Sequence, residues 1–217
     1  MSAAVPRRTP PGGNSDHRRR ADGAPWQGTG PVGEPHLTDA ARAARQMLTA
    51  LGVDVTKESL ARTPERMVSA LAELMSPRPF QLTTFANDGN YDELIVARRI
   101  PLRSLCEHHM LPFIGTAHIG YLPGARILGL SKLARVLEHF SHRPQVQERL
   151  TTQVANWLRA QLEPAGVGVV IEAEHLCMTL RGVQAPGTTT ITSSLLGVLR
   201  DDPRSRAEFL ALTHAPS

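Results

Sequence analysis

The chain contains two cysteines, and each lies in a short motif that also contains histidine. The first motif is Cys106-Glu107-His108-His109, and the second, far downstream, is His175-Leu176-Cys177. Thiolate and imidazole are ligands that zinc favours, and Cys106 and His109 are close enough in sequence to bind one ion together. The fold must therefore return Cys177 to the first motif, and this requirement constrains everything between the two.

The ligand count leaves the kind of site open. A closed structural zinc site has four protein ligands, whereas a catalytic site has three and an open position for water. Here Cys106, His109 and Cys177 make three, and His108 or His175 is available as a fourth. A disulfide between the cysteines is the other alternative, but structural disulfides belong to oxidising compartments and the sequence has nothing that resembles a secretion signal.

Length and composition are those of one cytoplasmic domain with a tail. No apolar run approaches the roughly 20 residues of a membrane helix. Residues 1–36 are rich in proline, glycine and arginine and lack hydrophobic periodicity, which predicts a disordered tail. The run Arg18-Arg19-Arg20 is typical of a solvated arm, with contact to nucleic acid or another polyanion as the alternative.

Residues 37–76 have the pattern of a helical extension ahead of the main domain. Apolar residues recur at helical spacing from Leu37 to Leu51, and Gly52 follows as a stop signal. A second helix is predicted to begin at Thr63-Pro64, with Thr63 as its N-cap.

The extension is the first part of a domain predicted to cover residues 37–217. After the extension, this domain alternates strand and helix patterns. Strands are predicted at 92–100, 113–121, 167–181 and 188–196, helices beginning at Ser131 and Pro144, and a C-terminal helix at 203–212 after a core of 90–200. This order favours an α+β fold in which a helix pair packs on one face of an antiparallel four-stranded sheet. Alternation along the third strand would align its apolar residues with three residues of chemical interest, His175, Cys177 and Arg181.

Five segments, taken in order, resemble the signatures of the GTP cyclohydrolase I family. They are SLCEHHMLPF (104–113), HIGYLP (118–123), GLSKLAR (129–135), RPQVQERLT (143–151) and EHLCMTLRGV (174–183). The similarity extends from about Leu37 to Leu212. The resemblance implies a tunnelling fold (T-fold), in which strands from several subunits form a barrel and two rings form a homodecamer with active sites between subunits.

The implied activity is the hydrolytic opening of the guanine imidazole ring of GTP. C8 leaves as formate and the product is 7,8-dihydroneopterin triphosphate, the first step of folate and pterin biosynthesis. By resemblance, zinc is bound by Cys106, His109 and Cys177, and His108 and His175 are catalytic, with Ser131 assisting His108. Neither a membrane nor a nucleic acid is an implied partner.

The resemblance also implies a set of substrate-binding residues. Glu148, with Gln147 beside it, would accept hydrogen bonds from the N1–H and 2-amino groups of guanine. The triphosphate would be bound by cationic side chains, namely Lys132, Arg135, Arg181 and, with less support, Arg66.

Two residues near these motifs have other interpretations. His118 is available as a fourth ligand, but we expect a packing histidine, and we expect Glu107 to orient a neighbour through a hydrogen bond rather than act as a base. Two alternative functions are another T-fold enzyme that binds pterins or purines and a non-catalytic zinc-binding oligomer. The combination of motifs argues against both.

Overall fold

The computed structural model describes residues 36–214, so the predicted disordered tail lies outside the described part apart from its last residue. His36 to His214 fall within one compact unit. None of the helices among these residues combines the length and apolar character needed to cross a membrane.

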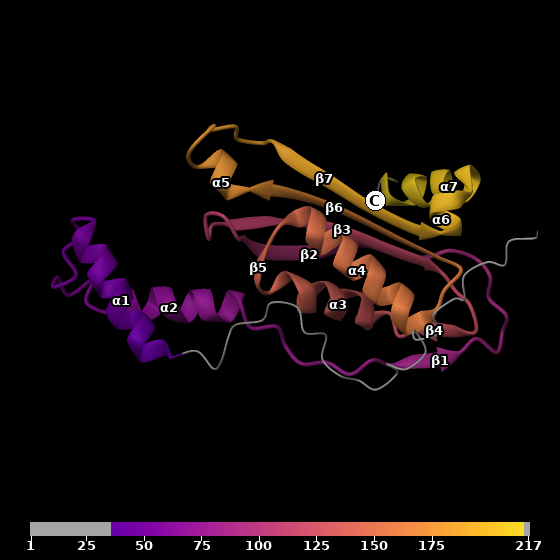
Figure 1. Ribbon diagram of the computed structural model, residues 1–217, viewed down its shortest axis with the longest axis horizontal. Helices are drawn as coiled ribbons and strands as arrows, with labels where there is room; N and C mark the ends of the chain where they lie inside the picture. The colour runs from indigo at the N-terminus through magenta and orange to yellow at the C-terminus, as the bar shows by residue number, and fades with distance from the viewer. Residues whose placement is uncertain (1–35, 215–217) are drawn as a thin grey trace, which may run out of the picture. The chain divides into compact units, whose positions relative to one another are not determined.

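The centre of the unit is a five-stranded sheet with the order β5-β2-β3-β6-β7 (Figure 1). Its strands are β2 (Ile95–Cys106), β3 (Pro112–Leu122), β5 (Pro144–Gln145), β6 (Gly166–His175) and β7 (Thr189–Gly197). The four long strands pair antiparallel, as predicted, and the short β5 adds a parallel edge beside β2. A separate two-stranded sheet joins β1 (Thr84–Ala86) to β4 (Arg126–Leu128).

Two helices, α3 (Ser131–Ser141) and α4 (Gln147–Leu162), pack against the sheet. Their apolar side chains join alternate residues of β6 in one core, which includes Leu137, Val154, Val169 and Ile171. Val170 points the other way, into a smaller cluster with Leu199 of α6 (Val198–Asp201) and Phe209 of α7 (Pro203–His214). The alternation of neighbouring residues thus gives the first part of β6, residues 166–171, two covered faces, which explains its continuous apolar sequence.

The helical extension consists of α1 (Leu37–Ala50) and α2 (Thr63–Leu74), which contact each other. Gly52 has φ +83°, the left-handed conformation expected of a glycine just after a helix. Thr63 is the first helical residue rather than the N-cap, because Arg62 occupies the cap position. From α2 the chain passes over α3 and α4, with the Phe80 ring 5.9 Å from the rings of both His139 and Trp157.

Some predicted boundaries were wrong. The first strand extends beyond Ile100 to Cys106. Pro101 does not end it, because Pro101 is exposed and still pairs with β3. After Pro101 the alternation of buried and exposed side chains continues, with Leu102 and Ser104 buried. The helix predicted to begin at Ser131 does begin there, although Ser131 makes no side-chain cap bond among the described residues. Pro144 belongs to β5, so the helix predicted to begin there begins at Gln147.

Close contact between β3 and β6 near the site depends on Gly115, opposite Ala173. A Cβ at Gly115 would lie 1.9 Å from the backbone oxygen of Glu172, which cannot move without disrupting the strand. We predict that Gly115→Ala lowers the free energy of unfolding by about 1–3 kcal/mol, measured by chemical denaturation. Gly89→Ala is the control, since a Cβ there has nothing within 4 Å. Equal stability of the two variants would contradict the packing argument.

Candidate metal centre and active site

The hairpin between β2 and β3 positions the first two candidate ligands. Cys106 is the last residue of β2, and its backbone N–H donates to Leu111 O at 2.9 Å, closing the connection between the strands. The backbone N–H groups of His109 and Met110 donate to Cys106 O at 3.3 and 2.8 Å, and Met110 has φ +54°. This tight turn brings the His109 side chain back to Cys106.

Cys177 comes from a different element than the sequence predicted. β6 ends at His175, and Leu176–Thr179 form α5, a single helical turn. The last pairs of β6 are Phe113↔His175 with β3 and Glu174↔Thr189 with β7. The ladder with β3 cannot extend further, because the next residue of β3, Pro112, has no N–H to donate. The predicted strand face therefore ends at His175, and neither Cys177 nor Arg181 continues it.

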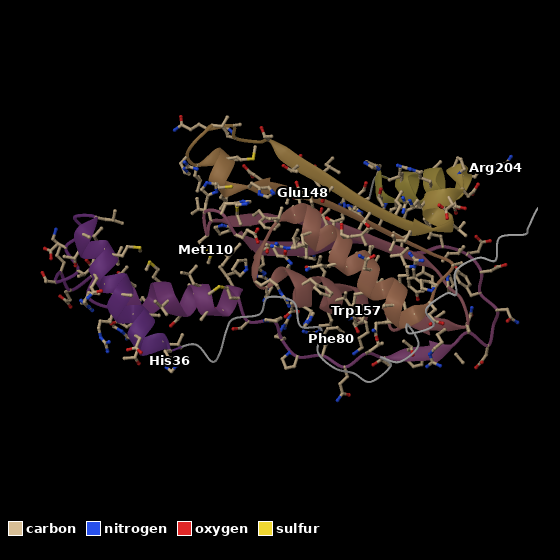
Figure 2. All side chains as sticks on the ribbon, viewed as in Figure 1. His36, Phe80, Met110, Glu148, Trp157 and Arg204 are labelled. Carbon is tan, nitrogen blue, oxygen red and sulfur yellow. The ribbon has the colours of Figure 1, made fainter. Side chains whose placement is uncertain are left out.

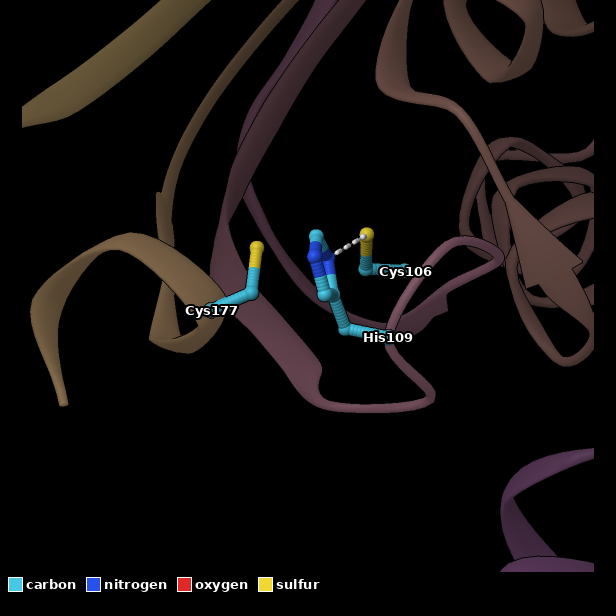
Figure 3. A group of neighbouring side chains, drawn as sticks. All are labelled: Cys106, His109 and Cys177. Atoms are coloured by element: carbon cyan, nitrogen blue, oxygen red, sulfur yellow. Dashed lines mark hydrogen bonds between the residues drawn. The ribbon is translucent and has the colours of Figure 1, made fainter. Parts of the chain in front are cut away.

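The hairpin and α5 nevertheless bring the three predicted ligands together (Figure 3). The ligand atoms of Cys106, His109 and Cys177 all lie within 4.8 Å of one another, and Cys106 Sγ is 3.8 Å from His109 Nδ1. Tetrahedral zinc with ordinary Zn–S and Zn–N bond lengths separates such atoms by about 3.5 Å. The arrangement and its soft donors thus fit a zinc ion, with the exposed His109 on the open side of two buried thiols.

The surroundings of Cys177 favour its protonated form. Burial raises the pKa of the Cys177 thiol, contact with Cys106 raises it further, and the positive charge of Arg181 acts in the opposite direction. A divalent cation reverses this preference for the protonated form, because a coordinating thiol is deprotonated. The site is therefore suited to a cation.

The two histidines predicted to be catalytic lie beside this group. His108 Nδ1 is 3.9 Å from Cys106 Sγ, and its exposed ring lies edge-on to that of His109 with centroids 6.3 Å apart. The His175 ring stacks on Phe113, with centroids 4.6 Å apart and an interplanar angle of 8°. Burial lowers the pKa of His175, while the carboxylate of Glu148 raises it.

The two predicted guanine-binding residues differ in exposure. Glu148 is exposed in the first turn of α4 (Figure 2), where an acidic side chain is stabilised by the helix dipole. Gln147 is only 1% exposed, and its amide contacts β6, β7 and His175. The side-chain amide of Gln147 is therefore directed into the protein, whereas the Glu148 carboxylate faces solvent.

The predicted phosphate-binding residues and Ser131 are spread over three places. Arg181 is close to the metal ligands, since its Nη1 donates to Cys177 O at 3.4 Å. Ser131 and Lys132 are the first residues of α3, shortly after β4. The other end of α3 leads into β5, which pairs with Cys106. The length of this 11-residue helix, about 15 Å, therefore separates Ser131 and Lys132 from the end near the metal ligands. Arg135 follows one turn later, and Arg66 is exposed on α2.

A set of contacts that the sequence did not indicate supports the hairpin. Arg149 donates to the Glu107 carboxylate and, at 3.0 Å, to Gln145 Oε1, and these contacts join α4 and β5 to the loop between the ligands. The Arg149 guanidinium lowers the pKa of Glu107, which is consistent with an orienting role for this carboxylate. Spacing alone gave no indication of Arg149, because its partner lies 42 positions away.

His118 is not part of the metal group. It lies in the middle of β3, paired with Val170, and the group formed among the described residues contains only Cys106, His109 and Cys177. Its Nδ1 is buried without a hydrogen-bond partner within residues 36–214, and burial lowers the pKa of His118. The expected packing histidine agrees with this position.

Comparison with known proteins identifies the family. The model of the family described as GTP cyclohydrolase I matches residues 40–214. The chain belongs to the GTP cyclohydrolase I family. The match includes both cysteine motifs, so the residues that form the metal group lie within the shared region.

Individual relatives are similar over most of their length. Proteins named GTP cyclohydrolase 1 from Synechococcus sp. (strain JA-3-3Ab) and Aquifex aeolicus are each 50% identical to the chain, covering 88% and 79% of it and 85% and 93% of the relatives. The protein of that name from Homo sapiens is 43% identical, covering 95% of the chain and 85% of the relative. Among solved structures, the archaeosine synthase QueF-Like in its apo form matches with a TM-score of 0.39 and 15% identity, covering 48% of the chain and 93% of that structure.

Arg135 belongs to an ion-pair group that predicts a pH dependence. Glu138, with a side chain 12% exposed, binds Arg78 at 2.5 Å and Arg135 at 3.3 Å. The hydrogen bond from Arg78 is the main cause that lowers the pKa of Glu138 from 4.5 to about 2. Because the folded-state pKa is depressed, the stabilisation is present above pH 4.5 and is lost as the pH falls toward about 2.

We therefore predict that Glu138→Gln lowers the free energy of unfolding at pH 7 by about 1 kcal/mol, a value reduced for the exposure of Arg78. The difference from wild type should narrow below pH 4.5. Denaturant midpoints measured from pH 7 to pH 3 test this, with Glu73→Gln on the exposed surface of α2 as the control. A difference that stays constant over this range would show that the carboxylate charge is not the cause.

Proposed function

We propose that the chain catalyses the zinc-dependent hydrolytic opening of the guanine imidazole ring of GTP, releasing C8 as formate and forming 7,8-dihydroneopterin triphosphate. The observation that carries this proposal is the convergence of Cys106, His109 and Cys177, with two further imidazoles beside them, in a member of the GTP cyclohydrolase I family. The relatives named GTP cyclohydrolase 1 support the same activity.

The metal group would be the two buried thiolates and the imidazole of His109. Three protein ligands leave one tetrahedral position for a non-protein ligand, which is typical of catalytic zinc. When bound, zinc supplies a nucleophile near neutral pH by lowering the pKa of coordinated water to about 7. This chemistry suits attack on C8 of the purine.

The remaining steps need proton transfer, which we assign to the two histidines. Opening of the imidazole ring requires protonation of a ring nitrogen, and histidine is the side chain that titrates near neutrality. His175 is two residues from the ligand Cys177 and is partly buried, so we assign it the protonation at the imidazole ring. The exposed His108 is assigned to later transfers near the ribose, and Ser131 of a neighbouring subunit is assigned to assist it.

Guanine recognition is assigned to Glu148. An ionised carboxylate accepts two hydrogen bonds from N1–H and the 2-amino group together, and adenine lacks this pair of donors. The influence of Glu148 on the pKa of His175 supports their proximity, which the bound purine would require. The carboxylate would fix the base while His175 acts on its other ring.

Complete triphosphate binding would need more than one subunit. Arg181 lies beside the metal ligands, whereas Lys132, Arg135 and Arg66 are on α3 and α2. We propose that an adjacent subunit supplies these cations, in the T-fold barrel and homodecamer that the family resemblance implies. In support, β7 has one strand neighbour among the described residues, and its Ile191 is 59% exposed, so this edge is available to pair with another subunit.

The direct test is to incubate the purified protein with GTP, measure formate, and detect neopterin by fluorescence after oxidation with iodine. Zinc-dependent formation of both products in equal amounts supports the proposal. Binding of zinc without turnover of GTP would instead favour the non-catalytic oligomer, and turnover of another purine or pterin would favour a different enzyme of the same fold.

The ligand assignment predicts two classes of variants. Cys106→Ala, His109→Ala and Cys177→Ala should each lose zinc to a chelator and lose activity, because two protein ligands remain. His175→Ala should retain zinc and GTP binding yet lose formate release, since its proposed role is proton transfer. Metal analysis distinguishes the classes, and near-full zinc in all three ligand variants would refute the assignment.

The guanine assignment predicts a loss of affinity. Glu148→Gln should weaken GTP binding roughly 10- to 100-fold, because a charge-assisted hydrogen bond contributes about 1.5–3 kcal/mol. Equilibrium binding measures the effect, and Glu163→Gln at the far end of α4 is the control. Unchanged affinity in Glu148→Gln would exclude the proposed contact.

A further inference from the structure

Gln147 is the most buried of the residues that the sequence associates with the substrate. It is the first residue of α4 and is 1% exposed. A side-chain amide needs hydrogen-bond partners when it is buried, and those partners determine which way it faces.

The amide nitrogen of Gln147 faces three oxygen atoms of β6 and β7. It donates to Ile171 O at 3.1 Å and Thr190 O at 2.9 Å, and it is 3.1 Å from Thr192 Oγ1. Backbone carbonyl oxygens only accept, so the group facing Ile171 and Thr190 must be the NH2 group. These two carbonyls therefore fix the orientation of the amide.

The two threonine hydroxyls complete a consistent set of donors. Thr151 Oγ1 donates to Gln147 O at 2.7 Å, and it is 2.7 Å from Thr192 Oγ1. Because each hydroxyl has one proton, Thr192 must donate to Thr151. The proton of Thr192 is therefore used, and its hydroxyl can only accept from Gln147. This requires the NH2 group of Gln147 on this side, which is the orientation that the two carbonyls set.

The orientation of Gln147 determines where the proton of His175 lies. With its nitrogen engaged on the strands, Gln147 presents Oε1 to His175 Nε2 at 2.7 Å. An amide oxygen only accepts, so Nε2 must carry the hydrogen. In neutral imidazole the other nitrogen, Nδ1, is then unprotonated.

Phe113 supplies a second constraint on the same ring. The two rings are nearly parallel, 8° apart, with centroids at 4.6 Å. Stacking limits the plane of the imidazole, and the hydrogen bond to Gln147 selects one of its two flipped orientations. Together they hold both the position and the tautomer of His175.

We propose that Gln147 is a positioning residue that holds His175 as the Nε2–H tautomer and leaves Nδ1 as the nitrogen that exchanges protons with the substrate. This inference rests on the proposed function for the role of His175, but the tautomer itself follows from the contacts of Gln147. It replaces the predicted contact with guanine, which would require the amide to leave two buried carbonyls unpaired.

The kinetic test is Gln147→Met, which retains the length of the side chain but removes its donor and acceptor. The expected result is a roughly 10- to 100-fold lower kcat with KM changed less than about threefold and with zinc retained. Gln153→Met is the matched control on the same helix, since Gln153 Oε1 accepts from Gln145 rather than contacting His175. A tenfold higher KM at unchanged kcat would make Gln147 a substrate ligand, and unchanged kinetics would remove it from the site; either result overturns the proposal.

A second measurement determines the tautomer directly in the wild-type protein. In the zinc-loaded wild-type protein labelled with 15N-histidine, solid-state NMR reports which ring nitrogen of His175 carries hydrogen, and the signal is identified by its loss in His175→Ala. Hydrogen on Nε2 supports the proposal, and hydrogen on Nδ1 alone overturns it. If wild type converts no GTP, the proposed function fails, while the NMR result still decides whether His175 carries its hydrogen on Nε2, as the contacts of Gln147 require.

Discussion

The pairing of β3 with β6 is the interaction on which the site depends. The ladder runs from Phe113↔His175 to Leu122↔Gly166, and it joins two segments that are far apart in the chain. Because the β2–β3 hairpin turns just before Phe113, this register brings its ligands to the end of β6, where His175 and then Cys177 follow. A one-residue slip would move His175 to the opposite face of the sheet and direct its side chain away from the metal group. The apolar residues that fix the register therefore also fix the chemistry.

Helix α4 organises the same end of the sheet through three consecutive residues. Gln147 is directed into the sheet, Glu148 is exposed, and Arg149 contacts the carboxylate of Glu107 in the hairpin. Successive residues of a helix differ by about 100° in direction, so one turn can serve three neighbours at once. The N-terminus of α4 thus links the loop that bears the ligands, the strand that bears His175 and the solvent side from which a substrate would enter.

Local patterns predicted most of the fold and part of the site. The stop at Gly52 and the inward face of β6 depend on residues close in sequence, so they could be inferred from spacing. The end of β6 could not, because it depends on Pro112 in a neighbouring strand. The contacts of Gln147 and Arg149 likewise depend on partners more than 20 positions away. The motifs predicted which three side chains come together, but only the fold reveals how each of them is held.

The single turn of α5 gives the metal group an asymmetric construction. Cys106 and His109 belong to one hydrogen-bonded hairpin, whereas Cys177 lies on a helix closed by the backbone bond from Leu180 N to Leu176 O. One turn is far too short to be stable alone, so its order depends on what it touches. Coordination of Cys177 would therefore contribute to folding this segment, and metal uptake and ordering of the turn would be thermodynamically linked. Exchange of the ion could then proceed by unwinding α5 while the sheet stays intact.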